Sequence, residues 1–79
     1  MKLPRDLSSD DLVKKLSELG YDVTRQTGSH IRLTTSDNGT HQVTIPAHNP
    51  IKIGTLNNIL RDVAQHFNLS KNELLEKLF

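Results

Sequence analysis

The sequence SSDDLVKKLSELG, residues 8–20, places its apolar positions at the spacing of an amphipathic helix. The apolar stripe consists of Leu12, Val13, Leu16 and Leu19. Ser8 or Ser9 can cap the amino end of this helix, and Gly20 is a suitable stop. We therefore predict a first helix within residues 8–20 that packs against the core.

Alternation with a period of two then predicts three strands, at residues 21–26, 30–35 and 41–45. The side chains expected on the inner face are Tyr21, Val23, Ile31, Leu33, Val43 and Ile45. Short links, Gly28-Ser29 and a turn at Asn38-Gly39, imply an antiparallel meander. The outer face is then polar and is expected to carry Asp22, Thr24, Gln26, His30, Arg32, Gln42 and Thr44.

Helical spacing returns near Thr55, which we interpret as the N-cap of a second helix that Asn68 ends. Its buried face is expected to hold Leu56, Ile59, Leu60, Val63 and Phe67. Ser70 and Glu73 form a capping box that starts a short extra helix. The chain is thus predicted to be an α+β protein of order α-β-β-β-α, with both helices on one face of an antiparallel three-stranded sheet. This layout resembles double-stranded-RNA-binding domains, which recognise shape, phosphates and 2′-hydroxyls more than base sequence.

The composition restricts the function classes. A length of 79 residues predicts a single domain, residues 1–79. The chain has no cysteine and its four histidines lack zinc spacing, so we expect no disulfide, no metal and no cofactor. Neither a signal peptide nor an apolar run of about 20 residues is present, which indicates a cytoplasmic protein without a membrane span. The net charge of +1 argues against a generic, charge-driven nucleic-acid binder.

His30 is the leading candidate for chemistry, because it follows the Gly28-Ser29 break and shares the outer face with Arg32. An imidazole can take up and release a proton near neutral pH, and a guanidinium can hold a phosphate. RNA supplies its own nucleophile, the 2′-hydroxyl, so a ribonuclease needs no metal for that step. The alternative is that His30 is an ordinary surface residue.

The other candidates each have a plain structural interpretation. His48 is either a second proton-transfer group or a polar loop residue. Thr55 either helps to bind phosphate at a helix start or only caps that helix. His41 is expected at a strand end, and His66 is expected to be solvated on its helix.

The chain contains the motifs GYDVTRQTGSHIRL, VTIPAH and GTLNNILRD, in this order and at this spacing. Together they resemble the HicA family of toxins, small mRNA-cleaving ribonucleases of toxin–antitoxin pairs, and the resemblance runs from about Leu12 to about Leu69. The resemblance implies that His30 is the functional histidine and that His48 matches the family's second histidine. It also aligns Gly54, Thr55 and Leu56 with the start of the family's second helix.

What the resemblance implies is an endoribonuclease neutralised by a HicB-type antitoxin protein that covers its active face. We expect His30 to be a general acid or base, with Arg25, Gly28, Ser29, Arg32 and Thr55 as RNA- or phosphate-binding residues. The net charge is lower than in many HicA proteins, and the segment beyond Ser70 extends past the match.

Two alternatives stay open at this point. One is a non-catalytic module that binds structured RNA on the same polar face. The other is a protein-interaction domain whose exposed face is only the docking site of a partner.

Overall fold

The computed structural model describes residues 6–79, and the expected order of elements is confirmed. Residues 1–5, part of the expected domain and of the amino end considered for a signal peptide, lie outside the described residues. The elements in chain order are α1 (Ser9–Ser17), β1 (Asp22–Thr27), β2 (His30–Thr35), β3 (His41–Pro46), α2 (Ile53–His66) and α3 (Lys71–Leu78). Within residues 6–79, no helix is both long and apolar enough to cross a membrane.

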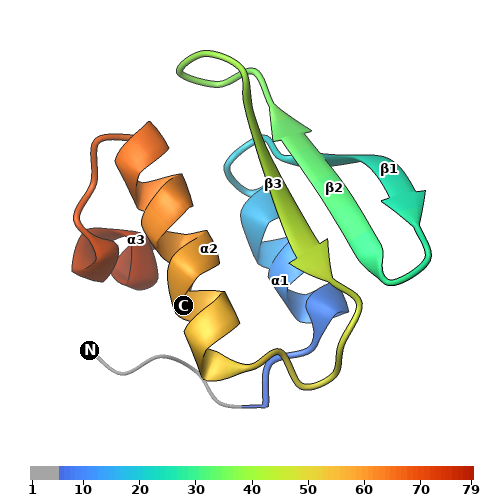
Figure 1. The fold of residues 1–79 in the computed structure, drawn as a ribbon. Coiled ribbons are helices and arrows are strands. Elements are labelled where there is room, and N and C mark those ends of the chain that lie inside the picture. The colour runs from blue at the N-terminus through green and yellow to red at the C-terminus, as the bar shows by residue number, and fades with distance from the viewer. Residues whose placement is uncertain (1–5) are drawn as a thin grey trace.

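The three strands form one antiparallel sheet in the order β1-β2-β3 (Figure 1). Strands β2 and β3 pair without interruption from His30 opposite Pro46 to Thr35 opposite His41. The β2–β3 loop contains Asn38 at φ 58° and Gly39 at φ 95°, as its turn sequence predicts. The meander expected from the short links is therefore confirmed.

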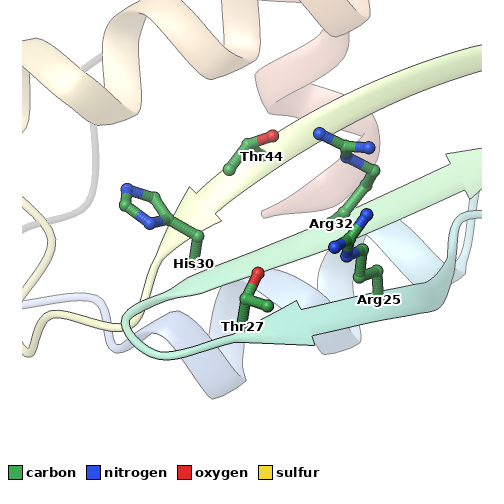
Figure 2. Close-up of a pocket in the computed structure, with 5 residues that line it drawn as sticks. All are labelled: Arg25, Thr27, His30, Arg32 and Thr44. Atoms are coloured by element: carbon green, nitrogen blue, oxygen red, sulfur yellow. The ribbon is translucent and has the colours of Figure 1, made fainter.

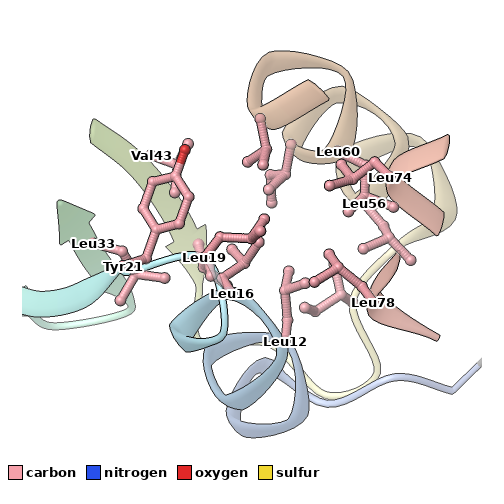
Figure 3. Close-up of a cluster of buried hydrophobic side chains, with 14 of the residues drawn as sticks. Leu12, Leu16, Leu19, Tyr21, Leu33, Val43, Leu56, Leu60, Leu74 and Leu78 are labelled. Atoms are coloured by element: carbon pink, nitrogen blue, oxygen red, sulfur yellow. The ribbon is translucent and has the colours of Figure 1, made fainter. Parts of the chain in front are cut away.

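The helices cover one face of the sheet, and the hydrophobic core lies between the two layers (Figures 1 and 3). The sheet contributes Ile31, Leu33, Val43 and Ile45, all at most 6% exposed. The helices contribute Leu12, Leu16, Leu56, Leu60, Leu74 and Leu75, none of which is exposed. The opposite side of the sheet, which carries His30, Arg32 and Thr44, is called the open face.

Local capping signals set most of the helix ends. Ser8 caps α1 by accepting a hydrogen bond from the amide of Asp11 at 3.0 Å. After α2, Asn68 adopts φ 57°, and the amide of Leu69 donates to the carbonyl of Ala64 at 2.8 Å, which ends the helix as predicted. The capping box of α3 is also confirmed, and this helix packs on α2.

The predicted start of α2 is wrong. The N-cap is Lys52, and Thr55 lies inside the first turn, so Thr55 does not cap the helix. The buried side chain of Ile51 fixes the chain just before the helix, and its amide donates to the carbonyl of Leu7 at 2.8 Å. Because this anchor is a tertiary contact, the helix begins earlier than the capping preference of threonine indicates.

Strand β1 departs from regular alternation at Thr24. Val23 lies opposite Leu33 and Arg25 lies opposite Arg32. Strand β1 therefore has one extra residue, Thr24, between two pairs that are consecutive on β2. This is the geometry of a β-bulge, which reverses the faces of all later residues in the strand. Gln26, expected on the open face, lies opposite the core residue Ile31 instead.

The position of β1 at the sheet edge also affects Val23. Its cross-strand partner Leu33 is fully buried, which places Val23 on the helix side as predicted. Its side chain nevertheless remains 49% exposed, because β1 is an edge strand of the described sheet and has a neighbouring strand, β2, on one side. Burial of Val23 was therefore predicted wrongly.

A polar and aromatic cluster closes the core at the end of the sheet where β3 begins. The hydroxyl of buried Tyr21 lies 2.7 Å from Nδ1 of His41, and the His41 ring stacks on the His66 ring with 4.5 Å between centroids. His66 donates from Nε2 to the carbonyl of Asp37 at 2.9 Å. His66 is thus half-buried and bonded, and the expectation that it is solvated is wrong.

The environment of this cluster favours the neutral forms of Tyr21 and His41. Burial raises the pKa of Tyr21 to about 12, and the carboxylate of Asp62 acts in the same direction. Burial, followed by the neighbouring His66, lowers the pKa of His41, while Asp62 opposes this shift. The Tyr21 hydroxyl and the His41 ring therefore share this hydrogen bond as neutral groups.

We expect the folded state to lose stability as the pH falls below about 6.5. The unfolded chain takes up a proton at His41 near that pH, whereas the lowered pKa means that the folded chain resists protonation. Urea unfolding at pH 7.5 and pH 5.0 should show this loss in the wild-type protein and a smaller loss in His41→Gln. The control is His48→Gln, an exposed position, which should lose as much stability between pH 7.5 and pH 5.0 as the wild type. An equal loss of unfolding free energy in all three proteins would contradict the role assigned to His41.

Candidate functional site

A shallow hollow of about 280 Å³ on the open face brings the leading candidates together. Its lining consists of Arg25, Thr27, His30, Arg32 and Thr44, which come from all three strands (Figure 2). All five residues are exposed. The imidazole and both guanidinium groups are therefore accessible to a ligand from solvent.

The Gly28-Ser29 break is a two-residue hairpin turn that places His30 at the start of β2. Gly28 takes the positive φ, 52°, and Thr27 pairs directly with His30. The carbonyl of Ser29 accepts a hydrogen bond from the amide of Ala47 at 2.6 Å, which joins the turn to the segment after β3. The backbone around His30 is thus held on both sides.

Arg25 and Arg32 face each other across β1 and β2, and their side chains rise from the same face of the sheet (Figure 2). The bulge at Thr24 is what gives Arg25 this orientation, because regular alternation from Tyr21 would turn it to the helix side. Of the described residues that line the hollow, none is acidic. The hollow therefore concentrates positive charge next to an imidazole.

Hydroxyl groups surround these charged side chains. Thr44 lies opposite Arg32 on β3, and Thr27 lies opposite His30 on β1. Farther along the sheet, the hydroxyls of Thr24 and Thr34 lie 2.8 Å apart and bond to each other. The open face thus combines neutral donors and acceptors with two cations, which suits a phosphate and ribose ligand.

His48 and Thr55 line a different hollow, of about 220 Å³, together with Pro46 and Lys52. Since Pro46 is the cross-strand partner of His30, this hollow lies on the β3 side of the first one. Nδ1 of His48 donates to the carbonyl of Pro50 at 2.9 Å, and this bond fixes the orientation of the ring. His48 is therefore an oriented side chain near His30.

The sequence-predicted site residues thus fall into three groups. Arg25, His30 and Arg32 share one hollow, His48 and Thr55 share the next, and Gly28 and Ser29 form the turn without lining either. Four lining residues were not among the predicted site residues, namely Thr27, Thr44, Pro46 and Lys52, although Thr44 was expected on the polar outer face. Counting back from the two-residue turn would have identified Thr27 as the partner of His30, while Lys52 carries no local sequence signal.

The histidines outside these hollows belong to the core-closing cluster. His41 contacts Tyr21 and His66, and this cluster lies at the end of β3 that is remote from Pro46. Across residues 6–79, no group of three or more His, Asp or Glu side chains is arranged to hold a metal ion.

The comparisons with known proteins gave one match. The family model for the HicA toxin of bacterial toxin–antitoxin systems matches residues 9–64, which include α1, the whole sheet and most of α2. No curated protein and no solved structure matches the chain. The matched segment contains both hollows and excludes α3.

One glycine lies on each side of β1, and alanine substitutions at the two positions should distinguish the cost of backbone strain from the cost of steric crowding. Gly28→Ala places its Cβ in open space, so only the positive φ is unfavourable and the cost is about 1 kcal/mol. Gly20→Ala, at φ 85°, adds a Cβ that lies 3.0 Å from Oγ1 of buried Thr35, whose bond to the Leu19 carbonyl holds it in place, so this variant should cost clearly more. Urea unfolding measures both; equal losses of stability would contradict the difference in crowding.

Proposed function

This chain belongs to the HicA family of bacterial toxin–antitoxin toxins. We propose that it is an endoribonuclease that cleaves mRNA without a metal and uses His30 as its catalytic residue. The observation that carries the proposal is that His30 shares one exposed hollow with the guanidinium groups of Arg25 and Arg32. An imidazole can act as the general base in transesterification of RNA, and the two guanidinium groups beside it can bind the reacting phosphate.

In the proposed reaction His30 acts first as a general base. It removes the proton of a ribose 2′-hydroxyl, and the resulting oxygen attacks the adjacent phosphorus. The bond from phosphorus to the 5′-oxygen of the next nucleotide breaks, and that oxygen receives a proton. The products are a 2′,3′-cyclic phosphate and a 5′-hydroxyl.

Arg25 and Arg32 are proposed to hold the phosphate and to stabilise the negative charge that develops on it. The two guanidinium groups face the same hollow from neighbouring strands, so both can donate hydrogen bonds to its oxygens. Thr27 and Thr44 complete the lining with hydroxyl groups. The strands of a sheet keep these side chains in fixed relative positions.

The acid that protonates the leaving oxygen is either His30 itself or His48. Two observations favour a mechanism that uses both histidines. The bond to Pro50 orients the His48 ring, and His48 lines the hollow next to the one that contains His30. In this form His48 is protonated at Nε2, the ring nitrogen that does not bond Pro50, and it gives that proton to the leaving oxygen. This form of the mechanism makes a separate prediction for His48.

Purified, partner-free protein should cut RNA in the presence of EDTA. The His30→Ala variant should cut RNA at least about a hundredfold more slowly. His30 is exposed, so thermal unfolding of the variant should match that of the wild type. The product ends are read by mass spectrometry. A clean 3′-hydroxyl end would rule out 2′-hydroxyl attack.

His48→Ala tests whether the second histidine takes part. A loss comparable to that of His30→Ala assigns the leaving-group proton to His48. A small loss assigns both proton transfers to His30. If neither the wild type nor His30→Ala cuts RNA while both bind it, the non-catalytic RNA-binding module is the better explanation.

The family also implies a partner, and we propose that a HicB-type antitoxin protein covers the open face. The charged hollow containing His30 is exposed, and the described helices lie on the opposite side of the sheet. A protein bound there would exclude RNA from His30 and Arg32. Neutralisation then needs no change in the toxin's own fold.

Expression of the protein alone in bacteria should arrest growth, whereas His30→Ala should not. The cause is the proposed RNA cleavage, which requires the imidazole, so growth curves and the decay of total mRNA report on it directly. Both proteins must be expressed to the same level. A harmless wild-type protein that copurifies with a partner and cuts no RNA would favour the docking-domain alternative.

A further inference from the structure

Among the described residues, no Tyr, Phe or Trp ring lies on the open face, and its planar groups are the His30 imidazole and the guanidinium groups of Arg25 and Arg32. The sequence contains one tyrosine, two phenylalanines and no tryptophan. Tyr21 is buried, Phe67 packs against the core, and Phe79 follows α3 at the end of the chain. None of these rings therefore reaches the open face.

Proteins that bind single-stranded nucleic acid on a sheet commonly stack successive bases on aromatic side chains. Here the equivalent positions hold hydroxyl and guanidinium groups, on Thr24, Arg25, Thr27, Arg32, Thr34 and Thr44. These groups match the phosphate oxygens and 2′-hydroxyls of RNA, which are the same for every base. The face is thus suited to the backbone of RNA rather than to its bases.

The arginine pair gives this face a specific place for one phosphate. Arg25 and Arg32 are direct cross-strand partners, and the Cβ atoms of such a pair are about 5 Å apart. Like charges in that position repel, and no described residue that lines the hollow supplies a carboxylate to compensate. An anion between the two guanidinium groups removes the repulsion.

We propose that the open face holds RNA by its ribose–phosphate backbone, with one phosphodiester between Arg25 and Arg32, and that base identity contributes little to affinity. This inference rests on the proposed function, because it concerns how the RNA that His30 cuts is held. Cleavage sites would then be set by the accessibility and shape of the RNA. The proposal adds recognition of the substrate class to the assignment of the catalytic group.

The test measures binding apart from cleavage, using His30→Ala so that the RNA stays intact. Labelled oligomers of uridine, of adenosine and of cytidine, and an abasic ribose–phosphate oligomer, each of about twelve nucleotides, are titrated by fluorescence anisotropy. We expect dissociation constants within about threefold of one another, because backbone contacts dominate. A preference above about tenfold for one base, or no binding of the abasic oligomer, overturns the proposal.

Arginine variants locate the phosphate. Arg25→Gln and Arg32→Gln, each in the His30→Ala background, should lower affinity for all oligomers alike and reduce the slope of log K against log salt by about 0.7 each. The matched control is Arg61→Gln, an exposed arginine on α2 outside the hollow. If Arg61→Gln weakens binding as much as the other two variants, the phosphate does not sit between Arg25 and Arg32.

A stability measurement distinguishes this site from general attraction to positive charge. At low salt without phosphate, Arg25→Gln should unfold at a higher temperature than the wild type, because the repulsion is gone. Adding inorganic phosphate should raise the unfolding temperature of the wild type more than that of the variant. No difference between the two proteins overturns the paired-arginine site.

The outcomes separate the two proposals. Cleavage by the wild type combined with strong base preference in binding leaves the ribonuclease standing and removes base-independent recognition. Absence of both cleavage and RNA binding removes the proposed function and this inference with it. Base-independent binding without any cleavage supports this inference and removes the catalytic role of His30.

Discussion

Two requirements on strand β1 cannot both be met by a strand whose side chains alternate regularly between the two faces of the sheet. At its start the chain must bury Tyr21 against the core, and at its end the hairpin turn must place Thr27 opposite His30. Strict alternation from Tyr21 would turn Arg25 and Thr27 toward the helices. The extra residue at Thr24 resolves the conflict, and the charged hollow of the open face exists because of it.

Local signals were sufficient for most of the fold. The Ser8 cap, the Asn38-Gly39 turn and the box of Ser70 with Glu73 act within a few residues, so they can be interpreted without knowledge of the partner segments. The start of α2 was missed because the burial of Ile51, a tertiary contact, decides it.

The site was predictable to a similar extent. His30 and Arg32 share a face by simple alternation within one strand, which any regular strand preserves. The inward turn of Gln26 depends on a bulge, for which the alternation counted from Tyr21 carries no signal. The half-burial of His66 depends on stacking with a ring from another element, and a helical pattern alone contains no information about that contact.

The bulge also affects which changes in sequence this strand can accept during evolution. A continuous strand ties its two ends together, since adding or removing one residue exchanges inside and outside along its whole length. A bulge absorbs such a change at one point, and at a sheet edge it does so without disturbing a further strand. The end near Tyr21 can therefore adapt to a changing core while the end near Arg25 keeps its orientation. Core packing and the orientation of side chains on the open face become separately adjustable within a single six-residue strand.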